Sequence, residues 1–397
     1  MIQIDFYSQD MISLLTPIYS LRPKTVYLLM DPTEASAPGI ASIRETILSW
    51  GFVRRLYFQP VNRHDIHAIL HCLQEIITAN SGQIYLDLTG GGELFAAAGY
   101  HVCQETAVTP VYMDLDREII YQIDSGAVVA KVRHIGAGDF ISAIGAKRLE
   151  DSHFLPAKAD YPSILAMAEA IFTHLPEWHA LHTYISDRLK FTKGKHSDAA
   201  PEQEKRISIA IPPYIRHHGI SYPTGFLVRR FVRHGFLTVK ENRRYRFASA
   251  EAMQYLRTFG IWLELYVYIK AQAFFDEAAL GVVIDWEKGD DLDTKDNEID
   301  VLVMYHSTPV FISCKMREIK AGDIYEVGYL AARLGGSQAK SIIATTAPVR
   351  EESANPTGIF KRLEKMKIGL IETGDFTRLP VKEVFARALK MTDSTFP

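Results

Sequence analysis

The chain has 397 residues, 47% of them hydrophobic and 23% charged, with a formal net charge of −3. These values are typical of globular protein, and the length allows two or three domains, each with its own core. They exclude a uniformly basic nucleic-acid-binding protein, so any contact with nucleic acid must come from a local patch.

Membrane and disulfide chemistry are not indicated by the sequence. No apolar run approaches the roughly 20 residues of a membrane span, and the N-terminus lacks a basic region followed by an apolar core. The three cysteines, Cys72, Cys103 and Cys314, lie far apart in apolar contexts. We therefore expect a cytoplasmic protein with no membrane partner, no disulfides and no zinc cluster.

The first 125 residues alternate short apolar runs with amphipathic runs. The strand-like runs are Ile2–Tyr7, Thr25–Met30, Val53–Phe58, Gln83–Leu88 and Pro110–Leu115, and helix-like runs include Ile40–Trp50 and His64–Ile77. Such alternation predicts a parallel sheet with helices on both faces, Rossmann-like in type. In that architecture ligands bind at the carboxyl ends of the strands.

Two strand ends have the composition of a ligand site. Ser8, Gln9 and Asp10 follow the first strand, and Thr89, Gly90, Gly91, Gly92 and Glu93 follow the fourth and open a helix. Glycines between a strand and a helix start let backbone amides approach a phosphate, and the helix dipole favours an anion there. The spacing is neither a Walker A loop nor Gly-x-Gly-x-x-Gly, so a plain tight turn remains an equal alternative.

The middle of the chain is rich in arginine. The stretch from Arg206 to Arg246 has nine Lys or Arg residues and one acid, Glu241. Phe226–His234 reads as a helix, and Phe236–Val239 with Tyr245–Phe247 as a hairpin, which together outline a winged-helix element. Such a hairpin could follow a phosphate backbone, and a basic surface that supports a dimer interface is an equal alternative.

Several polar groups carry no functional prediction. Three histidines recur on one face of a helix, but no further metal ligand lies near them in the sequence. One acidic loop lacks the glycine and closing glutamate of a calcium-binding EF-hand. Solvated surfaces explain both sets, which are His64, His67 and His71, and Asp290, Asp291, Asp293 and Asp296. Ile119–Val132 is expected to extend the first sheet, and Phe140–Arg148 to form a short helix that leaves it.

A second group of candidate functional residues lies between Gly260 and Lys315. Gly260–Tyr268 reads as a helix with Glu264 near its start, and Asn297–Met304 and Val310–Lys315 read as neighbouring strands. Because side chains alternate across a strand, Asp300 shares a face with Glu298, and Phe311, Ser313 and Lys315 share a face of the next strand. In the obvious register, Asp300, Ser313 and Lys315 converge.

These residue types suit metal-assisted phosphodiester hydrolysis. Carboxylates bind Mg²⁺ or Mn²⁺, the bound metal acidifies a water and offsets charge on the phosphate, and a lysine positions the nucleophile. A strand and helix after Lys340, Ser341–Thr345 and Thr357–Met366, and a last strand at Gly369–Ile371, complete an α/β domain. Glu326, on the helix Asp323–Arg333, is most simply a surface residue.

Two segments of the chain resemble known protein families. Residues 260–315 resemble the PD-(D/E)xK nuclease fold, and Leu86–Glu93 resembles the Asn-x-Thr-Gly-Gly-Thr-Lys signature of CARF domains, the cyclic-oligoadenylate sensors of type III CRISPR systems. Asp87 stands where asparagine is usual, and Gly92-Glu93 where Thr-Lys is usual. The order of the two parts is similar to that of CRISPR-ancillary nucleases, and the resemblance covers roughly residues 1–145 and 255–345.

The resemblance implies an α/β protein with three parts. These are a CARF sensor at 1–150, a helical, winged-helix-like connector at 151–250 and a PD-(D/E)xK nuclease at 251–397. It implies a homodimer that binds cyclic tetra-adenylate through Ser8–Asp10 and Thr89–Glu93. The activated protein would cut or nick DNA, with single-stranded RNA as a further candidate substrate.

The catalytic set predicted from these observations is Glu264, Asp300, Ser313 and Lys315. Ser313 occupies the place of a family glutamate, and because a hydroxyl is a poor ligand for a hard divalent ion, we expect Glu264 and Asp300 to hold Mn²⁺ or Mg²⁺. Two alternatives stay open: a ligand-controlled DNA-binding regulator with an inert nuclease fold, and a sensor that itself degrades the cyclic ligand.

Overall fold

The computed structural model describes residues 1–34, 39–148, 155–193, 208–284, 297–350 and 358–392. Its internal contacts divide the chain into two compact units, which are interleaved in sequence. Unit 1 comprises residues 1–148, 275–311 and 325–341, and unit 2 comprises 149–274, 312–324 and 342–397. The acidic loop at 290–296 and the polar segment at 194–207 lie outside the described residues.

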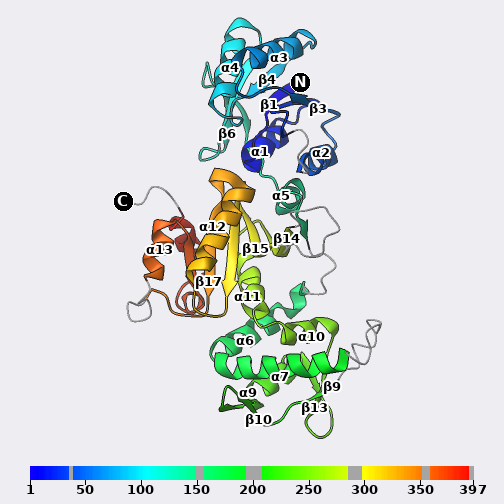
Figure 1. Ribbon diagram of the computed structural model, residues 1–397, viewed down its shortest axis with the longest axis vertical. Coiled ribbons are helices and arrows are strands. Elements are labelled where there is room, and N and C mark those ends of the chain that lie inside the picture. The colour runs from blue at the N-terminus through cyan, green and yellow to red at the C-terminus, as the bar shows by residue number, and fades with distance from the viewer. Residues whose placement is uncertain (35–38, 149–154, 194–207, 285–296, 351–357, 393–397) are drawn as a thin grey trace. The chain divides into compact units, whose positions relative to one another are not determined.

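The N-terminal part of unit 1 is a seven-stranded sheet of order β3-β2-β1-β4-β5-β6-β7 (Figure 1). The strands β1 to β5 are parallel, and β6 and β7 extend the sheet antiparallel. Their bounds are β1 Ile2–Phe6, β2 Thr25–Met30, β3 Arg55–Pro60, β4 Ile84–Asp87, β5 Thr109–Asp114, β6 Ile119–Gln122 and β7 Val128–Lys131. The sequence-based expectation of a Rossmann-like sheet is confirmed.

Helices cover both faces of this sheet. The helices α3 and α4 pack on one face through a core that includes Leu73, Phe95 and, from the central strand, Phe6, whereas Leu21 of α1 packs against Val111 on another part of the sheet. Their bounds are α1 Met11–Leu21, α2 Gly39–Ser49, α3 Ile66–Thr78, α4 Glu93–Glu105 and α5 Ala137–Ala143. Every residue of β1 is buried, as expected for a strand at the centre of a covered sheet.

A second sheet has six strands in the order β18-β17-β16-β15-β14-β8. Their bounds are β8 Lys147–Arg148, β14 Glu277–Ile284, β15 Asn297–Tyr305, β16 Thr308–Lys315, β17 Lys340–Thr345 and β18 Gly369–Glu372. The two expected strands around the Asp300 and Lys315 positions are therefore neighbours joined by a two-residue turn. The helices of this C-terminal region are α11 Ile261–Ala271, α12 Ala321–Gly335, α13 Ile359–Lys365, α14 Asp375–Arg378 and α15 Val381–Lys390, with a 3₁₀ turn, η2, at Gly336–Gln338.

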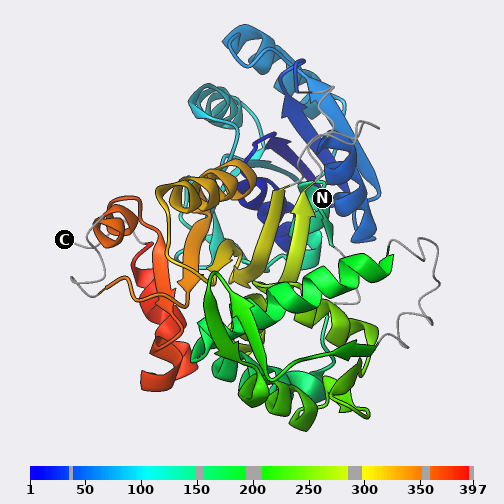
Figure 2. The ribbon, with the colours of Figure 1, turned by 60° about the horizontal axis from the view of Figure 1, so that its bottom comes forward.

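The connector, residues 155–257, belongs to unit 2 and contains a small three-stranded sheet of order β12-β13-β9. Its long helix α7 is the long green helix in Figure 2. The bounds are η1 Lys158–Asp160, α6 Tyr161–Phe172, α7 Leu175–Lys193, β9 Ser208–Ala210, β10 Tyr214–His217, β11 Ile220–Pro223, α9 Gly225–Arg233, β12 Leu237–Val239, β13 Arg244–Phe247 and α10 Ala250–Arg257. The predicted helix and hairpin of the winged-helix outline are both present.

An aromatic core explains why the Gly-x-Trp-Leu-Glu helix is held firmly within unit 2. Trp262 of α11 is fully buried and meets Trp178 of α7 edge to face, with ring centroids 6.2 Å apart. Phe231 of α9 and Phe236 lie 5.7 and 5.3 Å from the same indole. Such rings bury large apolar areas and prefer this tilted geometry.

Three local expectations were wrong or incomplete. The segment 140–148 was expected to be one helix, but α5 ends at Ala143 and the chain then forms β8, which pairs with β14. His64 was expected within a helix, but it precedes α3, whose N-cap is Asp65. The strand β14 was not anticipated. No described helix is long and apolar enough to cross a membrane.

Candidate functional site

The two predicted ligand loops of unit 1 lie side by side. They follow β1 and β4, which are adjacent parallel strands, so their carboxyl ends meet at one edge of the sheet. A Cβ atom built on Gly90 would lie 3.4 Å from Cβ of Ser8. The structure thus brings the first and the second loop together, as the sequence pattern predicted.

A cavity of about 520 Å³ opens at these loops. Its wall is formed by Tyr7, Ser8, Gln9, Glu34, Arg63, His64, Gly91, Gly92, Glu93, Leu94 and Phe95. Five of the predicted ligand-binding residues line it: Ser8, Gln9, Gly91, Gly92 and Glu93.

The other three predicted ligand-binding residues hold the loops in shape. The carboxylate of Asp10 accepts hydrogen bonds from the amides of Ile12 and Ser13, at 3.1 and 3.3 Å, and so caps α1. Thr89 donates its hydroxyl to Asp87 at 2.6 Å and accepts the amide of Met113 at 2.9 Å. Gly90 lies against Ser8 and does not line the cavity.

Sequence reasoning missed the charged groups of this cavity. Arg63 and His64 follow β3, and Glu34 follows β2, so they come from the same edge of the sheet as the predicted loops. The guanidinium of Arg63 lies 3.2 Å from a carboxylate oxygen of Glu34. Because the carboxyl ends of parallel strands meet at one edge of a sheet, the residues after β2 and β3 were also candidates for the ligand site. The sequence prediction considered only the residues after β1 and β4.

The glycines of the second loop have different physical reasons. Gly91 has φ +87°, and a Cβ there would lie 2.1 Å from Cβ of Phe6, which is buried in the core. Gly92 has φ +89°, caps α4, and has nothing within 4 Å of a built Cβ. Gly91 is therefore required by packing, and a valine there would disrupt the fold directly. Gly92 leaves open space where backbone amides start a 13-residue helix.

Two buried carboxyl groups lie beneath the loops. Asp5 of β1 and Asp87 of β4 are each 2% exposed and share a hydrogen bond. Burial raises the pKa of Asp87 to about 6, although Thr89 and Asp5 donate hydrogen bonds to it. Burial, with the neighbouring charge of Asp87, raises the pKa of Asp5 well above its ordinary value. The shared hydrogen bond also raises the pKa of Asp5 and lowers that of Asp87, so Asp5 is the protonated partner and donates to Asp87. Gln3 also donates to Asp5, at 3.0 Å.

This pair explains the unexpected aspartate in the CARF-like motif. An asparagine at position 87 would offer an amide N–H toward Asp5 and an oxygen toward Thr89. With aspartate, a proton held on Asp5 supplies the hydrogen bond that the amide would otherwise make.

The predicted catalytic residues occupy the elements expected for them. Asp300 lies on β15 and is half-buried between buried Ile299 and Val301. On β16, Ser313 and Lys315 are half-buried on either side of buried Cys314. The predicted alternation is thus present on both strands. Glu264 lies in the first turn of α11 and is half-buried, and a Cβ on Gly260 would lie 3.1 Å from its carboxylate.

Charged neighbours surround Lys315 within unit 2. Asp323 of α12 is 7% exposed and accepts two 2.7 Å hydrogen bonds from the guanidinium of Arg317. Burial opposes ionisation of Asp323, but these bonds, the amide of Lys320 and the charge of Lys315 outweigh it and lower its pKa. Two other acids considered from the sequence, Glu298 and Glu326, are exposed.

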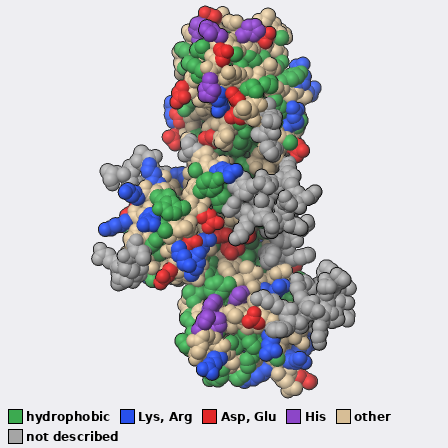
Figure 3. All heavy atoms as spheres, in the orientation of Figure 1, with side chains coloured by type: hydrophobic (Ala, Val, Ile, Leu, Met, Phe, Trp, Pro, Cys, Tyr) green, Lys and Arg blue, Asp and Glu red, His purple; other side chains and the backbone are tan. Residues whose placement is uncertain are grey.

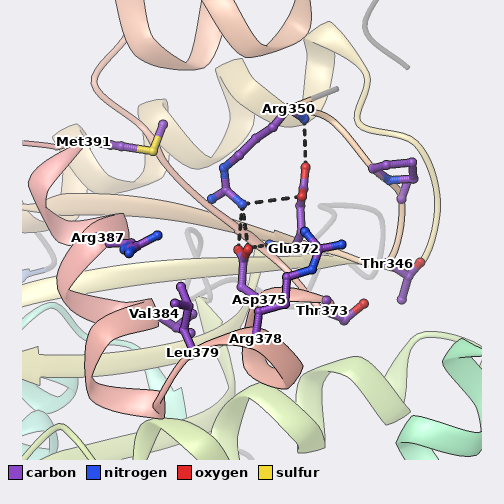
Figure 4. Close-up of a pocket in the computed structure, with 13 residues that line it drawn as sticks. Thr346, Arg350, Glu372, Thr373, Asp375, Arg378, Leu379, Val384, Arg387 and Met391 are labelled. Atoms are coloured by element: carbon purple, nitrogen blue, oxygen red, sulfur yellow. Dashed lines mark hydrogen bonds and ion pairs between the residues drawn. The ribbon is translucent and has the colours of Figure 1, made fainter. Parts of the chain in front are cut away.

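A second cavity, of about 620 Å³, lies in the C-terminal part of unit 2 (Figure 4). Its lining begins at Thr346, whose amide donates to the carbonyl oxygen of Lys315 at 3.3 Å. Arg350 binds Asp375 at 2.7 Å and Glu372 at 3.4 Å, which fixes one wall. Further lining residues are cationic, namely Arg378 and Arg387. The carboxyl end of β16, at Lys315, therefore lies beside a cavity whose lining includes Arg350, Arg378 and Arg387.

The connector presents its basic residues to solvent. In the wing between β12 and β13, Arg243 has φ +58° and is exposed, as is Arg244. Arg229 and Arg233 of α9 are also exposed. Figure 3 shows Lys and Arg side chains on the lowest part of the surface, where Figure 1 labels α9, β10 and β13. Arg206 lies outside the described residues.

No protein-family model and no curated protein sequence matches the chain, but solved structures do. The chain is similar to protein VC1899 from Vibrio cholerae over 99% of both chains, with a TM-score of 0.74 and 16% identity. It is similar to Can2 from Sulfobacillus thermosulfidooxidans, solved in complex with cyclic tetra-adenylate, over 99% of both chains, with a TM-score of 0.62 and 16% identity.

A third likeness is to a type III CRISPR defence DNA nuclease activated by cyclic oligoadenylate. It covers 92% of this chain and 52% of that one, with a TM-score of 0.52 and 16% identity. At these identities the likeness shows the fold alone: a Rossmann-like sheet followed by a C-terminal sheet domain, in the order that the sequence predicted.

Proposed function

We propose that this protein is a metal-dependent endonuclease of type III CRISPR defence that is activated by a cyclic oligoadenylate and cuts or nicks DNA. The observation that carries the proposal is the coincidence of two features in one chain. The fold resembles that of Can2, solved with cyclic tetra-adenylate, over 99% of both chains. The same chain carries Asp300, Ser313 and Lys315 on adjacent strands, with Glu264 on a buried helix.

Ligand recognition is assigned to the 520 Å³ cavity of unit 1. The amides that start α4, at Gly92 and Glu93, suit a phosphate because helix N-termini favour anions. The side chain of Arg63 lines the same cavity and supplies a cationic partner that the motif itself lacks, and His64 lines it as well. A cyclic tetra-adenylate has two-fold symmetry, so one ring would be shared by the equivalent cavities of a homodimer.

The hairpin gives the catalytic residues a defined expected register. The turn between β15 and β16 consists of His306 and Ser307, and a two-residue turn sets the flanking residues opposite one another. Counting back from that turn, we expect Asp300 opposite Ser313, and Lys315 two residues further along the same face.

The donor set fits a hard divalent ion. Asp300 and Glu264 are half-buried carboxylates, the ligand type that Mn²⁺ and Mg²⁺ prefer, and Ser313 offers a neutral oxygen. When bound, the metal would supply an acidified water and charge neutralisation at the phosphate. In this assignment the carboxylates bind, Ser313 donates at most a hydrogen bond, and the ammonium of Lys315 orients the nucleophile and the scissile phosphate.

A path for the polymer is proposed from the distribution of cations. The cavity beside the end of β16 contains Arg378 and Arg387, which would contact phosphates next to Lys315. The exposed wing at Arg243 and Arg244 would contribute salt-dependent, sequence-independent contacts. Single-stranded RNA has the same backbone charge, so it remains a candidate substrate.

The decisive experiment combines supercoiled plasmid, labelled single-stranded RNA, Mn²⁺ and purified protein, with and without cyclic tetra-adenylate. We expect ligand-dependent and metal-dependent cleavage that Asp300→Asn abolishes while ligand affinity is unchanged. Chromatography of the ring after the reaction tests whether the sensor degrades it. Cleavage at wild-type rate in Asp300→Asn would show that the chemistry lies elsewhere.

The second candidate is a ligand-controlled DNA-binding regulator, which the exposed arginines of the wing favour. It predicts tight, ligand-dependent DNA binding with intact plasmid in Mn²⁺. A charge reversal, Arg243→Glu with Arg244→Glu, would abolish that binding. For the nuclease, the same change would weaken substrate binding and reduce its salt dependence, and cleavage would persist at high protein concentration.

A further inference from the structure

We propose a second metal site, separate from the nuclease residues, formed by Glu118, His134 and His306. All three residues belong to unit 1. Among the described residues, this is the one group of three potential ligands whose donor atoms all lie within 4.8 Å of one another. The ligand class is a transition-metal dication that accepts two imidazoles and a carboxylate.

The distances are close to those between ligands that share a metal. Nδ1 of His306 lies 3.0 Å from Oε1 of Glu118, and Nε2 of His134 lies 3.6 Å from the same oxygen. Metal–ligand bonds of about 2.1 Å, separated by angles of about 90 to 110°, put neighbouring donor atoms about 3.0 to 3.4 Å apart. The 3.0 Å distance falls in this range, and the 3.6 Å distance and the separation of the two imidazole nitrogens, which is at most 4.8 Å, would shorten by rotation of exposed side chains around an ion.

The orientation of His134 is fixed by a buried partner. Its Nδ1 lies 2.9 Å from the hydroxyl of Ser307, a residue that is 1% exposed. With Nδ1–H donating to this hydroxyl, Nε2 carries its lone pair toward Glu118 and His306. Metal-binding histidines are commonly held in this way, by a hydrogen bond on the ring nitrogen that does not bind the metal.

The three ligands come from three different connections. Glu118 lies in the turn between β5 and β6, His134 follows β7, and His306 is in the two-residue turn between β15 and β16. An ion bound here would tie the antiparallel edge of the first sheet to the hairpin of the second. Its role would be structural, since it would link His306, in a hairpin of the second sheet, to Glu118 and His134, whose segments are already joined by the hydrogen bond from the amide of Val132 to the carbonyl oxygen of Glu118.

The donor set also selects the metal. Imidazole nitrogen suits Zn²⁺, Co²⁺ and Ni²⁺, whereas Mg²⁺, Ca²⁺ and Mn²⁺ favour oxygen ligands. Three protein ligands leave room for water to complete the coordination. The side chains of His134, Glu118 and His306 are 34%, 47% and 55% exposed, so we expect an exchangeable ion.

The test uses Co²⁺, whose visible absorption reports coordination directly. The full-length chain, without a histidine tag, is titrated in an Asp300→Asn background, so that the proposed nuclease carboxylates do not contribute. We expect one equivalent of Co²⁺ to bind, with competition by Zn²⁺. Glu118→Gln or His306→Ala should weaken that binding by at least about 10-fold, and Ser307→Ala by about 10-fold.

Two histidine variants serve as matched controls. His101 lies 3.5 Å from Glu105 in an equally exposed pair, and His217 lies 3.0 Å from His179 in the connector. His101→Ala and His217→Ala should leave the Co²⁺ titration unchanged. The proposal is overturned if Glu118→Gln and His306→Ala, folded by circular dichroism, bind Co²⁺ as the parent chain does, or if the parent chain binds none.

Discussion

The buried pair of Asp5 and Asp87 predicts that the seven-stranded sheet is destabilised near neutral pH, and that Asp87→Asn relieves this. An acid with a raised pKa binds more protons when folded than when unfolded, so the free energy of unfolding falls as pH rises between its two pKa values. For Asp87 that window runs from the ordinary value of 3.8 to about 6. The penalty is therefore absent at low pH and complete above the upper value.

The magnitude follows from the width of the window. A difference of about two pKa units, at about 1.4 kcal/mol per unit, gives about 3 kcal/mol for Asp87 alone. The substitution also removes the charge and the hydrogen bond that raise the pKa of Asp5, leaving burial as the remaining cause. Asparagine is isosteric, can donate to Asp5 and can accept from Thr89, so no buried polar group loses its partner.

Urea unfolding of the full chain between pH 4.5 and 8 measures the effect. We expect Asp87→Asn to be more stable than wild type by as much as about 3 kcal/mol at pH 7.5, with the difference shrinking toward pH 4. Asp116→Asn, in an exposed turn, is the control and should show no such trend. A variant that is less stable at pH 7.5, or a difference that does not change with pH, would refute the shared-proton interpretation.

Three further predictions concern the proposed nuclease residues and the turn at Gly336. Lys315→Ala should reduce cleavage by at least about 100-fold while calorimetry shows unchanged ligand affinity, and near wild-type cleavage would remove this residue from the site. Glu264→Gln should lose cleavage activity as completely as Asp300→Asn, whereas Ser313→Ala should retain much of it. The reverse pattern in plasmid assays would show that other residues bind the metal. Gly336→Ala should destabilise the chain and weaken ligand binding, because a Cβ there would lie 2.7 Å from the N-cap carboxyl of α1. Gly358→Ala has the same φ of +66° but open space around it, so it is the control for backbone strain, and equal effects of the two variants on ligand affinity would contradict the steric explanation.

Local patterns in the sequence determined the strands of the first sheet and the β15–β16 hairpin of the second, but not β8 or β14. Alternation of short apolar runs with amphipathic runs predicted the parallel sheet, and two-residue periodicity predicted that Ser313 and Lys315 share one face of β16, where both are half-buried. These features depend on neighbours in sequence, since side chains alternate on a strand and apolar residues recur with the period of the element that buries them.

Residues distant in sequence supplied what the sequence alone could not give. Arg63 lines the ligand cavity because β3 lies in the same sheet as β1, two strands away. Glycine is required at position 91 because any side chain there would collide with Phe6 of β1. The proton shared by Asp5 and Asp87 arises from burial and from the pairing of β1 with β4. The pKa of a buried carboxyl and the space around a glycine both depend on which strands become neighbours. Only the tertiary structure determines that arrangement.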